Sequence, residues 1–388
     1  MDFNLSSAQL ALQARAREVG RRWRDQSPKW DAEDEAPYRD ILASLREAGL
    51  LGLTIPKEYG GKGGDAMDYA IVVEELVRGS RSWILGEGPF CTTGPGPSMI
   101  LLAEDERTRM KYLPAVVRGD MGCAIALTEP NHGSDLTELE TTAVADGHTF
   151  IINGHKRFIT GAPHNELYAV FARFDGIQGP RGVGCVLVER GTPGCELLRG
   201  DEFFGCRGLP HGEVILKDCR IPRENVVRGA GHFRELMTAF NMERLHNSIY
   251  SLSLAGIAYD DALAYVEKRK TFGKDVIEYQ SVYHDLVDMY LAIEAQRLLT
   301  WRAAATADQG VFPRVLEASL SKLNGSQMAP QVTLTGVKLH GGDGTTMRFP
   351  IQIALRDAVT ALVAGGAPAV LKNAIAAQLY PNRRFSQK

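Results

Sequence analysis

The sequence predicts an α+β fold in which a helical N-terminal domain, a middle antiparallel β domain and a C-terminal helical bundle follow one another. Helix signals fill the chain up to residue 120, β-rich runs occupy residues 121–231, and helical patterns return over residues 232–388. A chain of 388 residues is also too long for one small hydrophobic core. We therefore expect three domains, residues 1–120, 121–231 and 232–388.

The first domain begins with a capping-box pattern, in which Ser6 is followed three positions later by Gln9. An apolar face starts directly after it. Two stretches rich in glycine and proline, residues 55–65 and 86–98, interrupt the helical pattern. Because both residue types are poor helix formers, we expect neither stretch to be helical.

The middle domain opens its β-rich part with TFIINGHKRFIT, residues 149–160. The pair Asn153-Gly154 is a strong hairpin signal, so this stretch is predicted to be two strands joined by a turn. Three further runs rich in β-branched residues follow before residue 228. The domain is therefore expected to be an antiparallel sheet.

The last domain begins with a helix, from Phe233 to Leu263, whose apolar residues lie on nearly every side. Such a helix is buried inside a bundle. Residues 265–280 are expected to contain a helix end near Gly273. Near the C-terminus Gly365, Gly366 and Pro368 interrupt an apolar run, and the backbone is expected to break there.

Composition excludes several functional classes. The net charge is −3, so the chain lacks the excess of basic residues that is typical of a nucleic-acid-binding protein. No apolar run is long enough to span a membrane. The six cysteines have no C-x-x-C spacing and the nine histidines form no metal-ligand pattern, so no metal is expected. An acidic residue at position 2 and the absence of an apolar leader favour a cytoplasmic location.

Three polar stretches carry the chemistry. ALTEPNHGSD, residues 126–135, puts hydroxyls and backbone N–H groups at a strand end, where they can hold a heterocycle or a diphosphate. FIT, residues 158–160, puts an aromatic ring and a hydroxyl on one strand face, and residues 265–280 contain an arginine, a phenylalanine and a glycine at a helix end. Read singly, these are also an ordinary turn, an ordinary strand and a capped helix.

Taken together, these stretches resemble the acyl-CoA dehydrogenase family over almost the whole chain. The family pattern A-x-T-E-P-x-x-G-S-D is matched in residues 126–135, and I-N-G-x-K followed by W-I-T is matched in residues 152–160 with phenylalanine in place of tryptophan. The chain also matches three shorter family patterns, R-x-x-F-G…Q, G-G-x-G and R-D-A. The matching residues of these last three patterns are Arg269, Phe272, Gly273 and Gln280, then Gly341 to Gly344, then Arg356 to Ala358.

The resemblance implies an FAD site between the β domain and a C-terminal four-helix bundle, in a homotetramer. Ser134 would meet the diphosphate or the thioester ligand, and Lys338 stands where the family often has a glutamine. The family contacts to FAD fall on Leu127, Thr128, Gly133, Ser134, Phe158, Ile159 and Thr160. The contacts toward a neighbouring subunit's FAD fall on Arg269, Phe272, Gln280, Lys338, Gly341 and Gly342.

Oxidation of an acyl-CoA needs a base that removes the α-proton, and a buried carboxylate suits this role. The family's C-terminal glutamate position falls on Gly365, whose N–H could still donate to the thioester carbonyl. Glu243 lies on a stripe with Leu236, Phe240, Tyr250 and Leu254, so its carboxylate is expected among apolar groups on the buried helix. This arrangement resembles the isovaleryl-CoA and long-chain acyl-CoA dehydrogenase branches of the family, which place the catalytic glutamate at this helix position and lack the C-terminal one.

We therefore predict Glu243 as the catalytic base, with a structural ion pair to Arg244 or another arginine as the alternative. Arg244 would orient the base or the acyl carbonyl. Phe240 and Asn241 would lie near the CoA tail. Residues 86–98 fall where the family shapes its acyl pocket, so an unusual acyl group is expected.

The resulting functional hypothesis is an FAD-dependent acyl-CoA dehydrogenase that passes electrons to an electron-transfer flavoprotein. One alternative keeps the fold but changes the reaction, to an enoyl-CoA reductase or a desulfinase-type CoA-thioester enzyme. Another is one subunit of a heteromeric acyl-CoA dehydrogenase, whose partner completes the FAD site.

Overall fold

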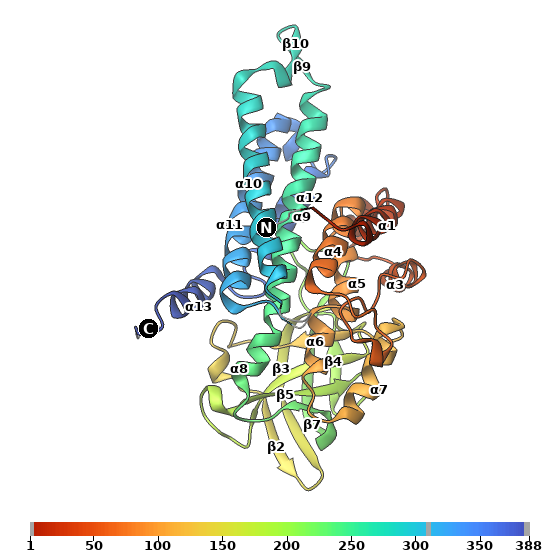
Figure 1. Ribbon diagram of the computed structural model, residues 1–388, viewed down its shortest axis with the longest axis vertical. Coiled ribbons are helices and arrows are strands. Elements are labelled where there is room, and N and C mark those ends of the chain that lie inside the picture. Colours follow the sequence, from red (N-terminus) through yellow and green to blue (C-terminus); the bar gives the residue numbers. More distant parts are fainter. Residues whose placement is uncertain (1–3, 308–311, 384–388) are drawn as a thin grey trace.

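The computed structural model describes residues 4–307 and 312–383. It is elongated, with the helical bundle at one end, the β domain at the other and the N-terminal helices along one side (Figure 1). Helices give way to strands between Val117 and Cys123, and strands to helices between Arg228 and Phe233. The α+β class and the order of the three parts are confirmed, while the domain limits at 120 and 231 stay a prediction.

Seven α-helices form the described N-terminal part. The first begins with the predicted capping box, because the Ser6 hydroxyl accepts from the Gln9 N–H at 3.2 Å and the Gln9 side chain accepts from the Ser6 N–H at 3.0 Å. Residues 55–65 contain only a short 3-10 turn. The helices are α1 Ser7–Trp23, α2 Ser27–Glu33, α3 Tyr38–Glu47, α4 Ala66–Ser80, α5 Ile84–Thr92, α6 Pro95–Leu101 and α7 Glu106–Val117.

The prediction that residues 86–98 are not helical is wrong, since α5 and α6 cover most of them. Almost every residue of the two helices is buried. Their glycines permit close packing: a Cβ added at Gly96 would lie 2.1 Å from the carbonyl oxygen of Cys123, and one at Gly88 would lie 2.5 Å from Leu45. Tertiary packing thus outweighs the low helix propensity of glycine and proline.

The middle part is one twisted sheet whose strand order is β6-β7-β3-β2-β4-β5-β8, with β1 beside β4. Most neighbours are antiparallel, but β4 pairs in parallel with both β1 and β2, which corrects the purely antiparallel prediction. The strands are β1 Cys123–Ala126, β2 Thr142–Asp146, β3 Thr149–Thr160, β4 Leu167–Phe174, β5 Val183–Glu189, β6 Cys195–Leu198, β7 His211–Pro222 and β8 Val226–Arg228.

The predicted hairpin turn at Asn153-Gly154 is also wrong. β3 is continuous through both residues, and its pairing with β7 shifts register there. A Cβ at Gly154 would lie 2.3 Å from the Thr141 hydroxyl, so the glycine serves a bulge against a neighbouring segment. The real turn lies between β2 and β3, where Gly147 has φ +58° and follows an aspartate. This Asp-Gly pair carried the same hairpin signal.

The C-terminal part is built around α9, which packs against α4, α10, α11 and α12. The predicted helix from Phe233 is divided at Phe240 and extends to Val266, so it ends before the helix end that was expected near Gly273. A tight β9–β10 hairpin follows, with positive φ at Phe272 and Gly273. The elements are α8 Phe233–Ala239, α9 Asn241–Val266, β9 Lys270–Thr271, β10 Lys274–Asp275, α10 Gln280–Ala305, α11 Val315–His340, α12 Ile351–Ala361 and α13 Pro368–Leu379.

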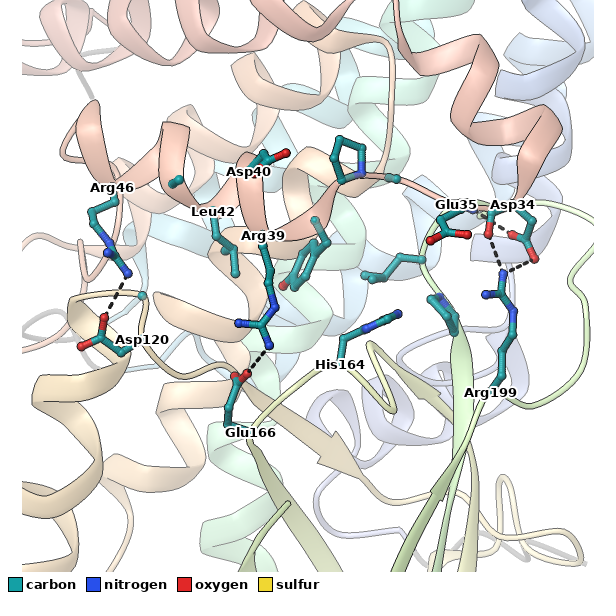
Figure 2. Close-up of a pocket in the computed structure, with 18 residues that line it drawn as sticks. Asp34, Glu35, Arg39, Asp40, Leu42, Arg46, Asp120, His164, Glu166 and Arg199 are labelled. Carbon is teal, nitrogen blue, oxygen red and sulfur yellow. Dashed lines mark hydrogen bonds and ion pairs between the residues drawn. The ribbon is translucent and has the colours of Figure 1, made fainter. Parts of the chain in front are cut away.

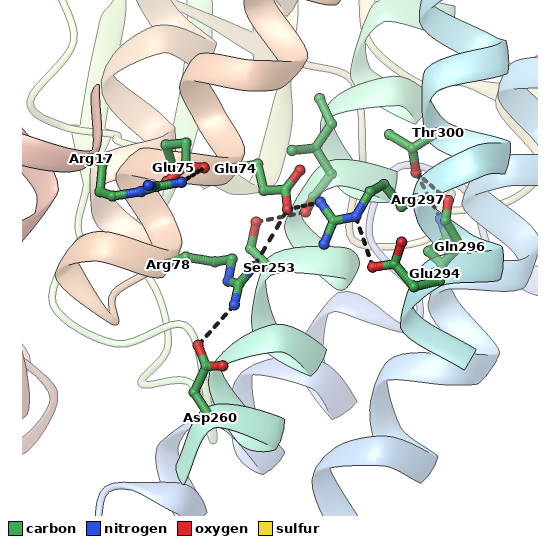
Figure 3. Close-up of polar contacts among 11 residues, drawn as sticks. Arg17, Glu74, Glu75, Arg78, Ser253, Asp260, Glu294, Gln296, Arg297 and Thr300 are labelled. Carbon is green, nitrogen blue, oxygen red and sulfur yellow. Dashed lines mark hydrogen bonds and ion pairs between the residues drawn. The ribbon is translucent and has the colours of Figure 1, made fainter. Parts of the chain in front are cut away.

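Ion pairs join α4 to its neighbours (Figure 3). Glu75 accepts from Arg17 of α1 at 2.7 Å, and Glu74 accepts from Arg297 of α10. Arg78 donates to Asp260 of α9 at 2.8 Å. These contacts fix the N-terminal helices against the bundle. Within the described ranges, no helix has the length and apolar content required to cross a membrane.

Replacing Gly96 with alanine is expected to destabilise the protein by about 1–3 kcal/mol, because the new methyl group collides with the backbone of β1. The midpoint of denaturant unfolding measures the effect. Gly229→Ala is the matched control, since no atom lies within 4 Å of a Cβ there, and it should change stability by less than about 0.5 kcal/mol. Equal midpoints for the two variants would contradict the packing argument.

Candidate active site

The Glu243 carboxylate lies in the first turn of α9, beside the double-glycine break between α12 and α13. A Cβ placed on Gly365 would lie 3.6 Å from the Glu243 Oε1 atom and 2.5 Å from the Asn247 amide nitrogen. Gly365 and Gly366 have φ of +65° and +111°, a region that favours glycine. The break therefore brings bare backbone against the predicted base.

Glu243 has no ion pair or hydrogen bond to its carboxylate among the described residues. Burial raises the pKa of Glu243 to about 8, and the negative charge of Glu87 raises it further against the opposing charges of Lys322 and Arg244. The structure therefore gives no support to the alternative of a structural ion pair. A carboxyl group with a pKa near the working pH is suited to proton transfer.

Lys322 of α11 holds the glycine break in place. Its ammonium donates to the carbonyl oxygen of Leu362 at 3.1 Å and to that of Gly366 at 2.9 Å, on the two sides of Gly365. Burial lowers the pKa of Lys322 to about 7, with the charge of Glu243 acting in the opposite direction. The sequence analysis missed this residue, although a lysine in the otherwise uncharged run ASLSKLNGS was a signal.

Arg244 and Asn241 bind each other inside the protein. The guanidinium donates to the Asn241 side-chain oxygen at 3.1 Å and to the Ser319 hydroxyl at 3.3 Å, and the Asn241 amide donates to the Pro313 carbonyl at 3.1 Å. Asn241 is fully buried and Phe240 lies in an apolar cluster. The Arg244 Nε–H is buried without a partner among the described residues, so this side chain keeps one free donor.

A second group of predicted residues meets at one end of the sheet. The Arg157 N–H donates to the Thr128 carbonyl at 3.0 Å and so joins the loop after β1 to the end of β3. Thr128 and Thr160 are partly exposed, and no hydrogen bond to either hydroxyl is found in the described chain. Phe158 has φ +60° and is 44% exposed, with its ring 5.6 Å from that of Phe203.

The remaining predicted residues of this group divide into two classes. Gly133 and Ser134 are exposed in the loop after β1, whereas Leu127 and Ile159 are buried in two different apolar clusters. Two free hydroxyls, an exposed aromatic ring and an exposed Gly-Ser turn thus share one sheet end. This donor set fits a planar heterocycle that carries carbonyl groups and a diphosphate.

A buried ion pair between Glu129 and Lys156 supports this sheet end. The two side chains are almost fully buried and 2.8 Å apart, and the ammonium also donates to the Leu127 carbonyl at 3.0 Å. The Glu129 carboxylate accepts the backbone N–H groups of Glu140 and Thr141. Burial lowers the pKa of Lys156 to about 8. Burial acts to raise the pKa of Glu129, but the charge of Lys156 and the hydrogen bonds to this carboxylate together lower it. Both groups are therefore charged near pH 7.

Three possible metal ligands lie close together at the same place. Ligand atoms of Glu129, His132 and Glu140 are all within 4.8 Å of one another. The Glu129 carboxylate is already occupied by Lys156 and by two backbone N–H groups, which leaves only His132 and the exposed Glu140. Two such ligands do not make a metal site, and we assign none here.

A third group lies at the far tip of the bundle, away from the β domain of the same chain (Figure 1). Phe272 is 99% exposed at the β9–β10 turn, and Lys338 forms an ion pair with Asp285 at 2.8 Å. The other members are exposed too, namely Arg269, Gln280, Gly341 and Gly342. One chain therefore does not bring these residues together with Thr128 and Thr160.

Two cavities lie elsewhere in the described chain. One of about 470 Å³ lies between α3 and the β domain (Figure 2), and its charged groups largely pair with one another. Examples are Arg39 with Glu166 at 3.4 Å and Arg46 with Asp120 at 3.1 Å. A second, of about 360 Å³, lies between α2 and α12. None of the predicted site residues lines either cavity.

The comparisons with known proteins confirm the resemblance. The models described as acyl-CoA dehydrogenase N-terminal, middle and C-terminal domains match residues 6–120, 124–219 and 231–380. The chain therefore belongs to the acyl-CoA dehydrogenase family, whose members are flavin-dependent oxidoreductases acting on CH–CH groups.

Particular relatives differ in the reaction that their names give. The chain is 31% identical to the short-chain specific acyl-CoA dehydrogenase of Clostridium acetobutylicum, covering 98% of this chain and 100% of that protein. It is 31% identical to the 3-sulfinopropanoyl-CoA desulfinase of Paraburkholderia xenovorans, covering 100% and 99%. It is 32% identical to a subunit of the caffeyl-CoA reductase-Etf complex of Acetobacterium woodii, covering 82% and 84%.

The structure of butyryl-CoA dehydrogenase from Megasphaera elsdenii superimposes on this chain with a TM-score of 0.92. It is 29% identical, and the match covers 98% of this chain and 100% of that one. The three-part architecture is therefore that of the family.

Replacing Lys156 with methionine is expected to cost about 3–5 kcal/mol of stability, because it leaves the Glu129 carboxylate buried and unpaired. Bound flavin should be lost as well, since the loop after β1 is released. Denaturant unfolding and the flavin absorbance of the purified protein measure both effects. The double variant Glu129→Gln/Lys156→Met removes both charges and should recover part of the loss. A single variant as stable as the wild type would show that the pair does not support the loop.

Proposed function

We propose that this protein is an FAD-dependent acyl-CoA dehydrogenase in which Glu243 is the catalytic base. The observation that carries the proposal is the meeting of a partly exposed, unpaired Glu243 carboxylate with the bare backbone at Gly365. A thioester whose carbonyl lies against Gly365 would present its α-carbon close to Glu243. Glu243 takes the α-proton, and the carboxylate becomes a carboxylic acid.

The backbone at Gly365 stabilises the same step. As the α-proton leaves, negative charge develops on the thioester oxygen, and the Gly365 N–H donates to it. Lys322 positions this N–H by binding the carbonyl oxygens of Leu362 and Gly366. Gly365 is therefore a catalytic residue through its backbone, and Lys322 is a positioning residue.

We propose that the cofactor is FAD. Thr128, Thr160 and the ring of Phe158 would hold the isoalloxazine, and Gly133 and Ser134 would hold the diphosphate. Leu127 and Ile159 would also contribute to this cofactor site. FAD supplies, when bound, the acceptor for the hydride that leaves the β-carbon. The free hydroxyls and the exposed ring at this sheet end support the assignment.

Binding of the CoA thioester is proposed for Ser134, Phe240, Asn241 and Arg244. Arg244 keeps a buried free donor, and Asn241 orients it through a hydrogen bond. Because Asn241 and Phe240 are buried, they act by shaping and positioning the site rather than by an exposed contact with the CoA tail.

We further propose a homotetramer, in which Arg269, Phe272, Gln280, Lys338, Gly341 and Gly342 reach the FAD of a neighbouring subunit. Their exposure at the tip of the bundle supports this. So does an apolar stripe on α10, in which Tyr283, Val287, Leu291 and Leu298 are 41–66% exposed on one helix face. A second copy of the chain is the occupant that we propose for this stripe.

An electron-transfer flavoprotein is the proposed electron acceptor. The supporting finding is the similarity to a subunit of a reductase-Etf complex. A cytoplasmic location is proposed as well, and the six cysteines, all of which are free, are consistent with it.

The alternatives keep this fold. The similarity to a reductase and to a desulfinase favours an enoyl-CoA reductase or a carbon–sulfur cleavage without net oxidation as a second function. A retained carboxylate at Glu243 argues for proton abstraction and therefore for the dehydrogenase. Product analysis in the absence of an electron acceptor separates these reactions.

Replacing Glu243 with glutamine is expected to slow reduction of the flavin by a CoA thioester by about 10²–10⁴-fold, because no base removes the α-proton. In the wild type, kcat/KM should rise with pH and level off above a pKa of about 8, since only the carboxylate form of Glu243 accepts the proton. Anaerobic stopped-flow bleaching of the flavin and a pH series of steady-state rates measure these effects.

Glu267→Gln is the matched control for this experiment. Glu267 follows the end of the same helix and is exposed, so its loss should leave bleaching unchanged. Undiminished turnover by Glu243→Gln would refute Glu243 as the base.

Replacing Leu291 with glutamate is expected to split the oligomer, because it places a charge in the apolar stripe of α10. Bound flavin should decrease in parallel if a neighbouring subunit completes the site. Light scattering after gel filtration measures the mass, and absorbance measures the flavin content. Val144→Glu is the control, since Val144 is 49% exposed on the β domain. Wild-type protein that is monomeric and colourless until another chain is added would favour the heteromeric alternative.

A further inference from the structure

A buried polar network extends from the proposed base toward the N-terminal helices. His246 follows Glu243 by three residues on α9, so the two side chains lie on the same side of the helix. The His246 Nδ1 atom is 2.7 Å from the Tyr69 hydroxyl of α4, and its Nε2 atom is 3.3 Å from the Glu87 Oε1 atom of α5. All three side chains are buried.

In one arrangement of protons, both ring nitrogens of His246 form hydrogen bonds. The Tyr69 hydroxyl donates to Nδ1, and the Nε2–H group donates to the Glu87 carboxylate. The Phe90 ring packs edge-on against the imidazole at 5.1 Å and fixes its plane. This network leaves the second carboxylate oxygen of Glu87, Oε2, buried without a hydrogen-bond partner among the described residues.

An unpartnered oxygen on a buried carboxylate is costly, so this oxygen favours a partner that can donate to it. The Glu87 side chain is 9% exposed, and it lies close enough to Glu243 for its charge to raise the pKa of that base. Glu87 is not used by the proton transfer proposed for Glu243. Its helix α5 is also the segment that the sequence analysis connected with the acyl pocket.

Helix α5 also contacts the sheet end that holds the free hydroxyls. Cys91 lies one turn after Glu87 on α5. Gly122 is close to both Cys91 and Asn165, because a Cβ added at Gly122 would lie 3.4 Å from the Cβ of Cys91 and 2.4 Å from the side-chain oxygen of Asn165. The amide of Asn165 donates to the Thr160 carbonyl at 3.4 Å. These contacts join α5, the helix that carries Glu87, to the end of β3.

We propose that Glu87 and His246 form a recognition site for the acyl end of the substrate, which selects an acyl group carrying a hydrogen-bond donor, either a hydroxyl or an ammonium group. This inference rests on the proposed function as a CoA-thioester dehydrogenase. The free Glu87 oxygen accepts from that donor, and His246 holds the carboxylate in place.

Two other classes of acyl group are disfavoured by the same geometry. A pure hydrocarbon leaves the Glu87 oxygen unsatisfied, and sites built around a buried polar group reject analogues that lack the matching donor. An acyl group that ends in a carboxylate brings a further negative charge next to Glu87 and Glu243. The site thus selects by charge and by hydrogen bonding.

The test uses the FAD-loaded enzyme and anaerobic flavin reduction by four matched probes, butyryl-CoA, 4-hydroxybutyryl-CoA, 4-aminobutyryl-CoA and glutaryl-CoA, together with the corresponding six-carbon series. In the wild type we expect kcat/KM for a donor-bearing probe to exceed that for its hydrocarbon analogue by about 10-fold or more. The hydroxyl and amino probes decide which donor is used.

Two variants at position 87 should then change the preference among the acyl probes in two different ways. Glu87→Leu should favour the hydrocarbon probe, because the acceptor is gone. Glu87→Gln should accept glutaryl-CoA better, because the negative charge is gone and the amide donates. Since Gln retains the shape of the side chain, it keeps the test decisive if the leucine variant does not fold.

The control is Glu74→Gln, which removes the charge of another buried acid, one that is paired with Arg297 of α10 (Figure 3). It should leave the ranking of the probes unchanged. A hydrocarbon preference in the wild type, or an equal loss for every probe in both Glu87 variants, would overturn the inference and indicate a structural role only. If no thioester reduces the flavin, the proposed function itself fails.

Discussion

The close contact between the break after α12 and the first turn of α9 is the constraint on which the site depends. It exists because Gly365 has no side chain: a methyl group there would collide with the Asn247 amide and crowd the Glu243 carboxylate. Lys322 fixes the contact by binding carbonyl groups on both sides of the glycine. A single buried cation thus holds bare backbone beside a free acid, and it does so without pairing directly with that acid.

Two acids in this region have different environments, and we therefore propose different uses for them. Glu243 is partly exposed and unpaired, and burial raises its pKa to about 8, which suits a proton acceptor. Glu87 is held by His246 and keeps one oxygen free, which suits recognition of a donor. A third acid, Glu129, is fully engaged by Lys156 and two backbone N–H groups, and its role is to fix the loop that carries Thr128. We thus propose that similar residues serve catalysis, selectivity and support.

Sequence patterns predict this structure well where a short run of residues fixes the backbone by itself. The capping box at Ser6, the order of helices and strands, and the break at Gly365 were all foreseen, because each depends on local backbone preferences. The patterns failed at residues 86–98 and at Asn153-Gly154, where packing against Cys123 and Thr141 decides the conformation. Lys322, His246 and Glu87 were missed for the same reason, since their partners lie far away in the sequence.

The sequence by itself determined the family, the three-part architecture and the identity of the acid proposed as base, because motif residues and helical periodicity are written in short segments. Only the tertiary structure decided that Glu243 is unpaired, that Lys322 holds the glycine break, and that Glu87 keeps a free oxygen. These properties depend on burial and on distances between α4, α5, α9 and α11. Hydrogen bonding and pKa values are set by such surroundings, and the surroundings exist only once the chain has folded.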